Sequence, residues 1–159
     1  MKIGVISDTH NVLHPKILRE FRGVDVILHA GDIVQPMILD ELRTVAPVTA
    51  VCGNCDVSEW GYDLPASVEL KFGNRRIFMI HEFPGCNPHH LPPALYSRWS
   101  IFRPQIVIFG HTHKPDNRQT AQILFFNPGS PTLPRGGHHP SIGILHLTQD
   151  TVIGEHIYL

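Results

Sequence analysis

The sequence predicts an α/β protein built as a double β-sheet sandwich, with two sheets packed face to face and helices outside. Apolar, β-branched runs recur along the chain and are typical of strands. The first third alternates strand, loop and helix, as parallel pairing requires, whereas later strands follow one another through short turns, as antiparallel pairing allows. The length of 159 residues, without a linker, predicts one domain over 1–159.

The expected elements follow in chain order. Pro15 suits the first turn of a helix that carries Ile17 and Phe21 on one face. Gly73-Asn74 is typical of a hairpin turn, and Gln149-Asp150 predicts a second hairpin. Strands are expected over 2–7, 25–30, 47–52, 67–72, 75–80, 105–109, about 122–126, 141–147 and 151–158. Helices are expected over 15–21, 36–43 and about 94–102.

Composition limits the classes of partner. The net charge is −1 and no block of like charges occurs, so nothing favours binding to nucleic acid or to an anionic membrane. No stretch approaches the roughly 20 apolar residues of a membrane span, and the first strand begins too early to leave room for a signal peptide. Cys52, Cys55 and Cys86 cannot form a closed set of disulfides. We expect a cytoplasmic protein, and homo-oligomer formation stays open.

Polar clusters follow five of the expected strands. The carboxyl ends of strands line the ligand crevice in open α/β sheets, so these side chains are expected to lie together. Divalent transition metals prefer imidazole nitrogen with carboxylate oxygen, which would also explain the high count of 12 histidines. The clusters are Asp8-Thr9-His10, Gly31-Asp32, Gly53-Asn54, His81-Glu82 and Gly110-His111-Thr112-His113.

Spacing within the clusters predicts how the ligands are presented. Asp8 and His10 alternate by two, so both would face one side of an extended segment, and the two histidines after Gly110 repeat that spacing. Asp32, a lone carboxylate after a glycine, is suited to bridge two cations. The predicted site therefore holds two metals, with candidate ligands Asp8, His10, Asp32, Asn54, His81, His111 and His113.

Each cluster has a structural alternative. Asp8 could be a helix N-cap or turn residue, and His81 could be a hydrogen-bonded histidine at a strand end. His111 and His113, two residues apart after a buried strand, have little structural use. The ordered set of all five clusters favours a site over five separate structural roles.

These motifs resemble those of calcineurin-like metallophosphoesterases, particularly the short bacterial and archaeal phosphodiesterase group, over essentially the whole chain. The motifs are Ser7-Asp8-Thr9-His10, His29-Ala30-Gly31-Asp32, Gly53-Asn54-Cys55-Asp56, Gly110-His111-Thr112-His113 and Asn127-Pro128-Gly129-Ser130. The resemblance implies an α/β/β/α sandwich. By position it implies one metal bound by Asp8, His10, Asp32 and His113 and a second bound by Asp32, Asn54, His81 and His111.

The chemistry expected from such a site is hydrolysis. A hydroxide bridging two cations is a nucleophile near neutral pH, and the cations offset the charge of an in-line transition state. We expect a divalent-metal-dependent phosphoesterase, with a phosphodiesterase favoured, acting on a small phosphoester. Manganese is the favoured metal, with nickel, cobalt, zinc or iron as alternatives. Asp32, Asn54 and His10 are the candidate catalytic residues.

Two positions depart from the family pattern. The wider family often has histidine after the asparagine, where it is thought to protonate the leaving group, and here Cys55, a poorer proton donor, stands there. Glu82 replaces a common glycine, and it could orient His81, reach a metal or lie in solvent. The candidate substrate-binding residues are Asn54, Gly129 and Arg135, although a turn-rich loop with a surface arginine is an equal alternative.

Two other functions compete with hydrolysis. The retromer subunit that shares this fold is mainly a protein-binding scaffold and lacks part of the ligand set, whereas the set here is complete. Cys52 and Cys55 have the spacing of a redox or zinc pair, but a structural zinc site needs a second such pair. The enzyme is therefore the favoured interpretation.

Overall fold

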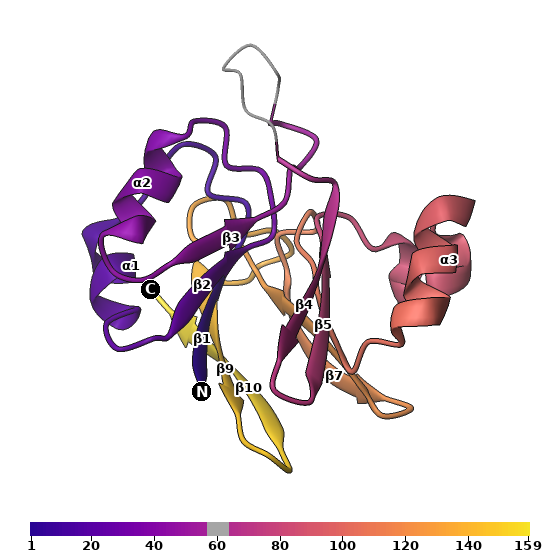
Figure 1. Ribbon diagram of the computed structural model, residues 1–159. Coiled ribbons are helices and arrows are strands. Elements are labelled where there is room, and N and C mark those ends of the chain that lie inside the picture. The colour runs from indigo at the N-terminus through magenta and orange to yellow at the C-terminus, as the bar shows by residue number, and fades with distance from the viewer. Residues whose placement is uncertain (57–63) are drawn as a thin grey trace.

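The computed structural model describes residues 1–56 and 64–159 and contains two five-stranded sheets that face each other. Helices α1 and α2 cover the outer face of one sheet and α3 covers the other, giving four layers (Figure 1). This arrangement confirms the predicted fold class. The helices are α1 (Pro15–Glu20), α2 (Met37–Arg43) and α3 (Pro93–Phe102), with short 3-10 turns at Pro84–Cys86 and Pro88–His90.

The first sheet has the order β10-β9-β1-β2-β3. Strands β1, β2 and β3 run parallel, as the alternation with helices predicts, and β9 pairs antiparallel with β1 and with β10. The last hairpin of the chain therefore completes the sheet begun by the first strand. The strands are β1 (Lys2–Ile6), β2 (Val26–His29), β3 (Val48–Ala50), β9 (Ser141–Leu147) and β10 (Val152–Tyr158).

The second sheet has the order β4-β5-β6-β8-β7. It is also mixed, because β5, β6 and β8 run parallel while β4 and β7 pair antiparallel at the two edges. The division into a parallel and an antiparallel half is therefore wrong at the level of single sheets. The strands are β4 (Ser67–Phe72), β5 (Arg75–Ile80), β6 (Ile106–Ile108), β7 (Pro115–Thr120) and β8 (Ile123–Pro128).

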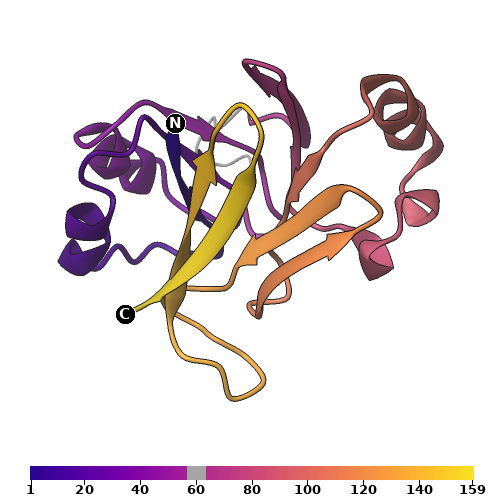
Figure 2. The same cartoon turned by 90° about the horizontal axis from the view of Figure 1, so that it is seen from below.

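Strand β7 is not predicted by the sequence pattern. Its residues are polar and largely exposed, and Pro115 stands at its first position. Such a strand lacks the apolar alternation of a half-buried strand and is tolerated because it forms a sheet edge. Asn117 then donates from its Nδ2 to the Gly154 carbonyl oxygen at 2.6 Å, and the β7-β8 hairpin lies beside the β9-β10 hairpin (Figure 2).

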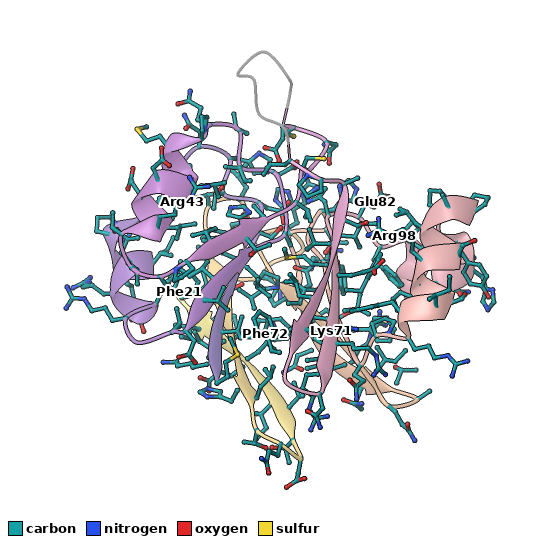
Figure 3. All side chains as sticks on the ribbon, viewed as in Figure 1. Phe21, Arg43, Lys71, Phe72, Glu82 and Arg98 are labelled. Atoms are coloured by element: carbon teal, nitrogen blue, oxygen red, sulfur yellow. The ribbon has the colours of Figure 1, made fainter. Side chains whose placement is uncertain are left out.

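Apolar side chains fill the space between the sheets and the space under each helical layer. Phe72, at the end of β4 in the second sheet, packs against the core between the two sheets, whereas Phe21 lies between the first sheet and its helices (Figure 3). Trp99 of α3 packs edge-on against Phe78 on the outer face of the second sheet, with ring centroids 5.5 Å apart. None of the helices in the described residues is long and apolar enough to cross a membrane.

The topology brings the carboxyl ends of six strands to one edge of the sandwich. Strands β1, β2 and β3 point to the upper edge in Figure 1, and β5, with the parallel strands β6 and β8, points the same way. Glu82, just after β5, marks this edge in Figure 3. The polar clusters of the sequence therefore meet there.

Candidate metal centre

The loop after β1 carries Asp8 and His10, and it is held by the loop after β2. The backbone N–H of Asp8 donates to the Gly31 carbonyl oxygen at 2.9 Å, and that of His10 donates to the Asp32 carbonyl oxygen at 3.0 Å. The spacing of Asp8 and His10 predicts an extended segment, and this prediction is wrong. Positive φ angles occur at five candidate ligands, namely Asp8 (54°), His10 (44°), Asp32 (56°), His111 (67°) and His113 (57°).

Positive φ is uncommon outside glycine and costs about 1–3 kcal/mol at each position. The loop-to-loop hydrogen bonds over-determine these conformations, which explains why they persist. Strained backbone of this kind is concentrated at functional sites, because it aims side chains in directions that a strand cannot provide. Here it aims ligands from separate loops at a common centre.

A first ligand group joins Asp8, His10, Asp32 and His113. Their ligand atoms all lie within 4.8 Å of one another. His113 Nε2 is 3.3 Å from Asp8 Oδ1 and 3.3 Å from His10 Nε2, and His10 Nε2 is 3.7 Å from Asp32 Oδ2. Asp8, Asp32 and His113 are buried, while His10 is half-buried.

A second group forms around the Asn54 side-chain oxygen. His81 Nε2 is 3.1 Å from this oxygen and His111 Nδ1 is 3.0 Å from it. His81 Nε2 also lies 3.4 Å from Asp32 Oδ1. The two groups therefore meet at one carboxylate, with Oδ1 of Asp32 facing the second group and Oδ2 facing the first.

Backbone carbonyls fix the orientation of two imidazoles. His81 Nδ1 lies 2.8 Å from the Ala30 oxygen, and His113 Nδ1 lies 2.6 Å from the Leu133 oxygen. A proton on each Nδ1 donates to the carbonyl and leaves Nε2 with a free lone pair that points into the site. Metal-binding histidines are commonly held in this way.

Burial dominates the electrostatics of the first group. Removal from water raises the pKa of Asp8 to about 6, although the electrostatic interaction with His81 and a hydrogen bond from Ser7 oppose this shift. Burial likewise lowers the pKa of His10 and His113, and the charge of Arg135 contributes to both. Neutral imidazoles next to buried carboxylates are the form in which a cation binds.

The donor set fits a transition metal better than calcium or magnesium. Two carboxylates with two imidazoles form the first group, and a carboxylate, an amide oxygen and two imidazoles form the second. Hard cations prefer all-oxygen sites, whereas manganese, iron, cobalt, nickel and zinc accept mixed nitrogen and oxygen ligands. A cation would also offset the cost of burying two carboxylates side by side.

Two glycines allow the loops to approach this closely. A methyl group added at Gly110 would overlap the Ser7 hydroxyl and come within 2.7 Å of Asp8 Oδ2. At Gly31, which has a φ of +95°, the added carbon would lie 2.7 Å from His81 Nδ1. Any larger residue at either position would therefore displace a candidate ligand.

Asp56 is a supporting residue whose role the sequence pattern does not reveal. Its carboxylate accepts four backbone N–H bonds, from Ile33 and Val34 at 2.7 Å to Oδ1 and from Gly53 at 2.7 Å and Asp32 at 3.0 Å to Oδ2. These bonds tie the loop that carries Asp32 to the turn that carries Asn54. The only indication in the sequence that Asp56 belongs to the site is its position two residues after Asn54.

A second layer of polar residues supports Asp8 and the loop after β6. Ser130 Oγ donates to the Asp8 carbonyl oxygen at 2.8 Å, and Asn127 Nδ2 donates to the Gly110 carbonyl oxygen at 2.9 Å. His29 is fully buried between Thr9 Oγ1 and the Gly31 N–H, and burial lowers its pKa to about 3. His29 thus braces the two loops as a neutral ring.

The remaining predicted site residues differ in how the structure presents them. Arg135 is exposed. Its backbone N–H donates to the His113 carbonyl oxygen at 3.2 Å, so the residue lies next to the site. Gly129 is buried and its N–H donates to Asn127, which removes the geometric support for phosphate binding there. Glu82 is exposed, with Oε1 3.9 Å from His111 Nε2.

Cys55 lies beside the carboxylate of Asp32. Its backbone N–H donates to Asp32 Oδ1 at 2.8 Å. Burial, followed by a hydrogen bond to Asp32 and the charge of that carboxylate, raises the pKa of the thiol to about 11. The side chain is therefore a protonated thiol at neutral pH and a weak acid toward a leaving alkoxide.

Known proteins are similar to this chain in sequence. The profile of the calcineurin-like phosphoesterase superfamily domain matches residues 1–150. A probable metallophosphoesterase of Methanothermobacter thermautotrophicus is 37% identical over 160 residues, covering 98% of this chain and 91% of that protein. Phosphodiesterase YfcE of Escherichia coli is 32% identical, covering 91% of this chain and 87% of YfcE.

Solved structures agree with the sequence comparisons. Escherichia coli YfcE, described as a phosphoesterase, superposes with a TM-score of 0.73 at 26% identity, covering 99% of each chain. Vps29 of Entamoeba histolytica, complexed with zinc, gives a TM-score of 0.71 at 26% identity and also covers 99% of each chain. Fold and site define a metallophosphoesterase-type hydrolase. The chain belongs to the calcineurin-like phosphoesterase superfamily, which confirms the predicted family.

Proposed function

We propose that the protein is a phosphodiesterase that uses two divalent transition-metal ions, manganese foremost, to hydrolyse a small phosphodiester. The observation that carries this proposal is the convergence of seven candidate ligands into two groups that share Asp32. The name of Escherichia coli YfcE, a phosphodiesterase, supports the choice of diesters. Free thiols at Cys52 and Cys55 support a cytoplasmic location.

Each residue of the site would have a separate role in hydrolysis. When bound, two cations supply activation of water and neutralisation of phosphate charge. Asp32 would contribute a ligand to each of them, because Oδ2 faces the first group and Oδ1 faces the second. Asn54 presents an uncharged oxygen and an exposed amide to substrate, and His10, half-buried in the first group, borders the attacked phosphate. Arg135 would pair with a non-bridging phosphate oxygen.

The site offers no strong general acid among the described residues to protonate the leaving group at the position of Cys55. Cys55 holds a protonated thiol beside Asp32, at the position suited to a general acid. A thiol with a pKa of about 11 is a weaker general acid at neutral pH than an imidazolium. The reaction is therefore expected to favour esters whose alcohols leave without help.

A scaffold function is the second candidate, and the likeness to Vps29 is its support. That protein is described with bound zinc, so metal binding alone does not separate the two functions. The complete ligand set and the phosphodiesterase relative favour the enzyme. Hydrolysis, rather than metal content, is the deciding measurement.

The test combines metal analysis with hydrolysis. Protein purified without chelator should contain close to two transition-metal ions per chain, and it should hydrolyse bis(4-nitrophenyl) phosphate. Chelation should abolish the activity, and added manganese should restore it. Absence of bound metal, with no activity on adding manganese, nickel, cobalt or zinc, would contradict the proposal. Bound metal without hydrolysis of any diester, monoester or nucleotide would favour the scaffold.

A further inference from the structure

An apolar pocket opens directly beside the first ligand group. It has a volume of about 450 Å³, and His10 belongs both to its wall and to the ligand group. Ligand sites are typically concave, mostly apolar and about 300–1,000 Å³ in volume, so this pocket has the size of a small-molecule site. Its apolar walls come from Val12, Pro131, Leu133, Pro140 and Leu159.

The pocket is built by the same loops that build the metal centre. Leu133 contributes its side chain to the pocket while its carbonyl oxygen accepts the hydrogen bond from His113 Nδ1 at 2.6 Å. Val12 lies two residues after His10, and its N–H donates to the Thr9 carbonyl oxygen at 3.0 Å. The two apolar walls are thus fixed relative to the ligands by hydrogen bonds.

Two of the wall side chains remain unusually exposed for apolar residues. Val12 is 55% exposed and Leu133 is 52% exposed. Exposed apolar surface grouped around a pocket next to reactive groups marks a place where a ligand covers it. His14 and Lys16 line the pocket as well, and the Lys16 ammonium donates to the Tyr158 carbonyl oxygen at 3.3 Å. The positive charge of Lys16 suits a ligand that carries a phosphate anion.

We infer that this pocket selects the substrate by binding one bulky, ring-bearing apolar substituent of the phosphoester while the phosphate lies at the metal centre. The inference rests on the proposed phosphodiesterase function and adds the substrate class to it. His10 belongs to both the first ligand group and the pocket wall, so a substituent of a phosphate held at the metal centre would reach the apolar walls past His10. A methyl substituent would leave the apolar walls in water, whereas a ring would cover them.

The test compares phenylphosphonate with methylphosphonate as ligands of the zinc-loaded full chain. Both carry the same phosphonate group, so the ratio of their dissociation constants, measured by calorimetry, gives the contribution of the substituent to binding. We expect phenylphosphonate to bind about tenfold more tightly, since burying a ring's apolar surface has at least this effect. Methyl resonances of Val12 and Leu133 should shift with phenylphosphonate and should stay unchanged with methylphosphonate.

Substitutions in and outside the pocket test whether the preference for phenylphosphonate arises there. The double variant Val12→Ser/Leu133→Ser keeps the Leu133 backbone carbonyl, and it should reduce the preference for phenylphosphonate to about twofold. Ile101→Ser on α3 removes a side chain that is 84% exposed and outside the pocket, and it should preserve the preference. Equal affinities in the unmodified protein, or an unchanged preference in the double variant, would overturn the inference.

Failure of the proposed function would be seen separately. Calorimetry and methyl resonances report binding without hydrolysis, so the pocket is tested even in a protein that hydrolyses nothing. A protein that cleaves diesters but binds both phosphonates equally would keep the function and lose the pocket. A protein that shifts Leu133 with phenylphosphonate but cleaves no ester would keep the pocket and lose the function.

Discussion

Replacing Asp56 by asparagine tests whether one supporting carboxylate holds the metal centre together. The carboxylate accepts four backbone N–H bonds from the two loops that carry Asp32 and Asn54. An amide offers one acceptor oxygen, so two of the four N–H groups would face an NH₂ group instead. Two lost bonds to a charged acceptor, moderated by partial access to water, correspond to about 2–4 kcal/mol of unfolding free energy. Metal affinity should fall about 10–100-fold as Asp32 loses its support.

Urea denaturation with chelator present measures the first effect, and activity against manganese concentration measures the second. Asp40→Asn is the matched control, because Asp40 lies on the surface and pairs with Arg43 at 2.6 Å. An exposed pair of this kind contributes at most about 1 kcal/mol, so the control should resemble the unmodified protein. If Asp56→Asn behaved like the control in both assays, the role assigned to Asp56 would be refuted.

Two further predictions concern the reaction itself. Asp32→Ala should reduce turnover at saturating manganese by more than about 100-fold, because it removes the group shared by both ligand sets. His10→Ala should reduce turnover less, and equal losses in the two variants would argue that Asp32 does not bridge the two metals. Aryl esters should be cleaved much faster than alkyl esters, because general acid catalysis typically contributes about 10²–10⁴-fold and the Cys55 thiol is a weak acid. For the same reason Cys55→Ser should change turnover little. Equal rates for esters with different leaving groups would indicate another proton donor.

The sequence predicts where the polar clusters meet because they follow strands. The runs before Asp8, Asp32 and His111 are buried strands, and a parallel arrangement brings their carboxyl ends together whatever the loops do. Topology therefore brings the polar clusters to one edge, and the hydrogen bonds between the loops then orient their side chains. Hairpin turns at Gly73-Asn74 and near Gln149-Asp150 are likewise local features, and both are confirmed.

The sequence predicts less where tertiary contacts decide the conformation. The spacing of Asp8 and His10 predicts an extended segment, but hydrogen bonds to Gly31 and Asp32 impose positive φ at both residues. The partners of these bonds lie more than twenty residues away, so no local pattern reveals them. Strand β7 was missed for a related reason, since its pairing with β8 stabilises a polar segment that has no strand signal of its own.

The same hydrogen bonds explain why fold and site cannot be separated in this chain. Asp32 is linked through its backbone to His10 and Asp56, and through its side chain to both ligand groups. A change that releases one loop therefore moves ligands in the other, and strained residues can relax only by leaving the centre. Metal bound across these loops would stabilise the folded state, because it binds the assembled groups and has no such site in the unfolded chain. The free energy of unfolding should therefore rise with metal concentration, and it should rise less in a variant such as Asp56→Asn that weakens metal binding.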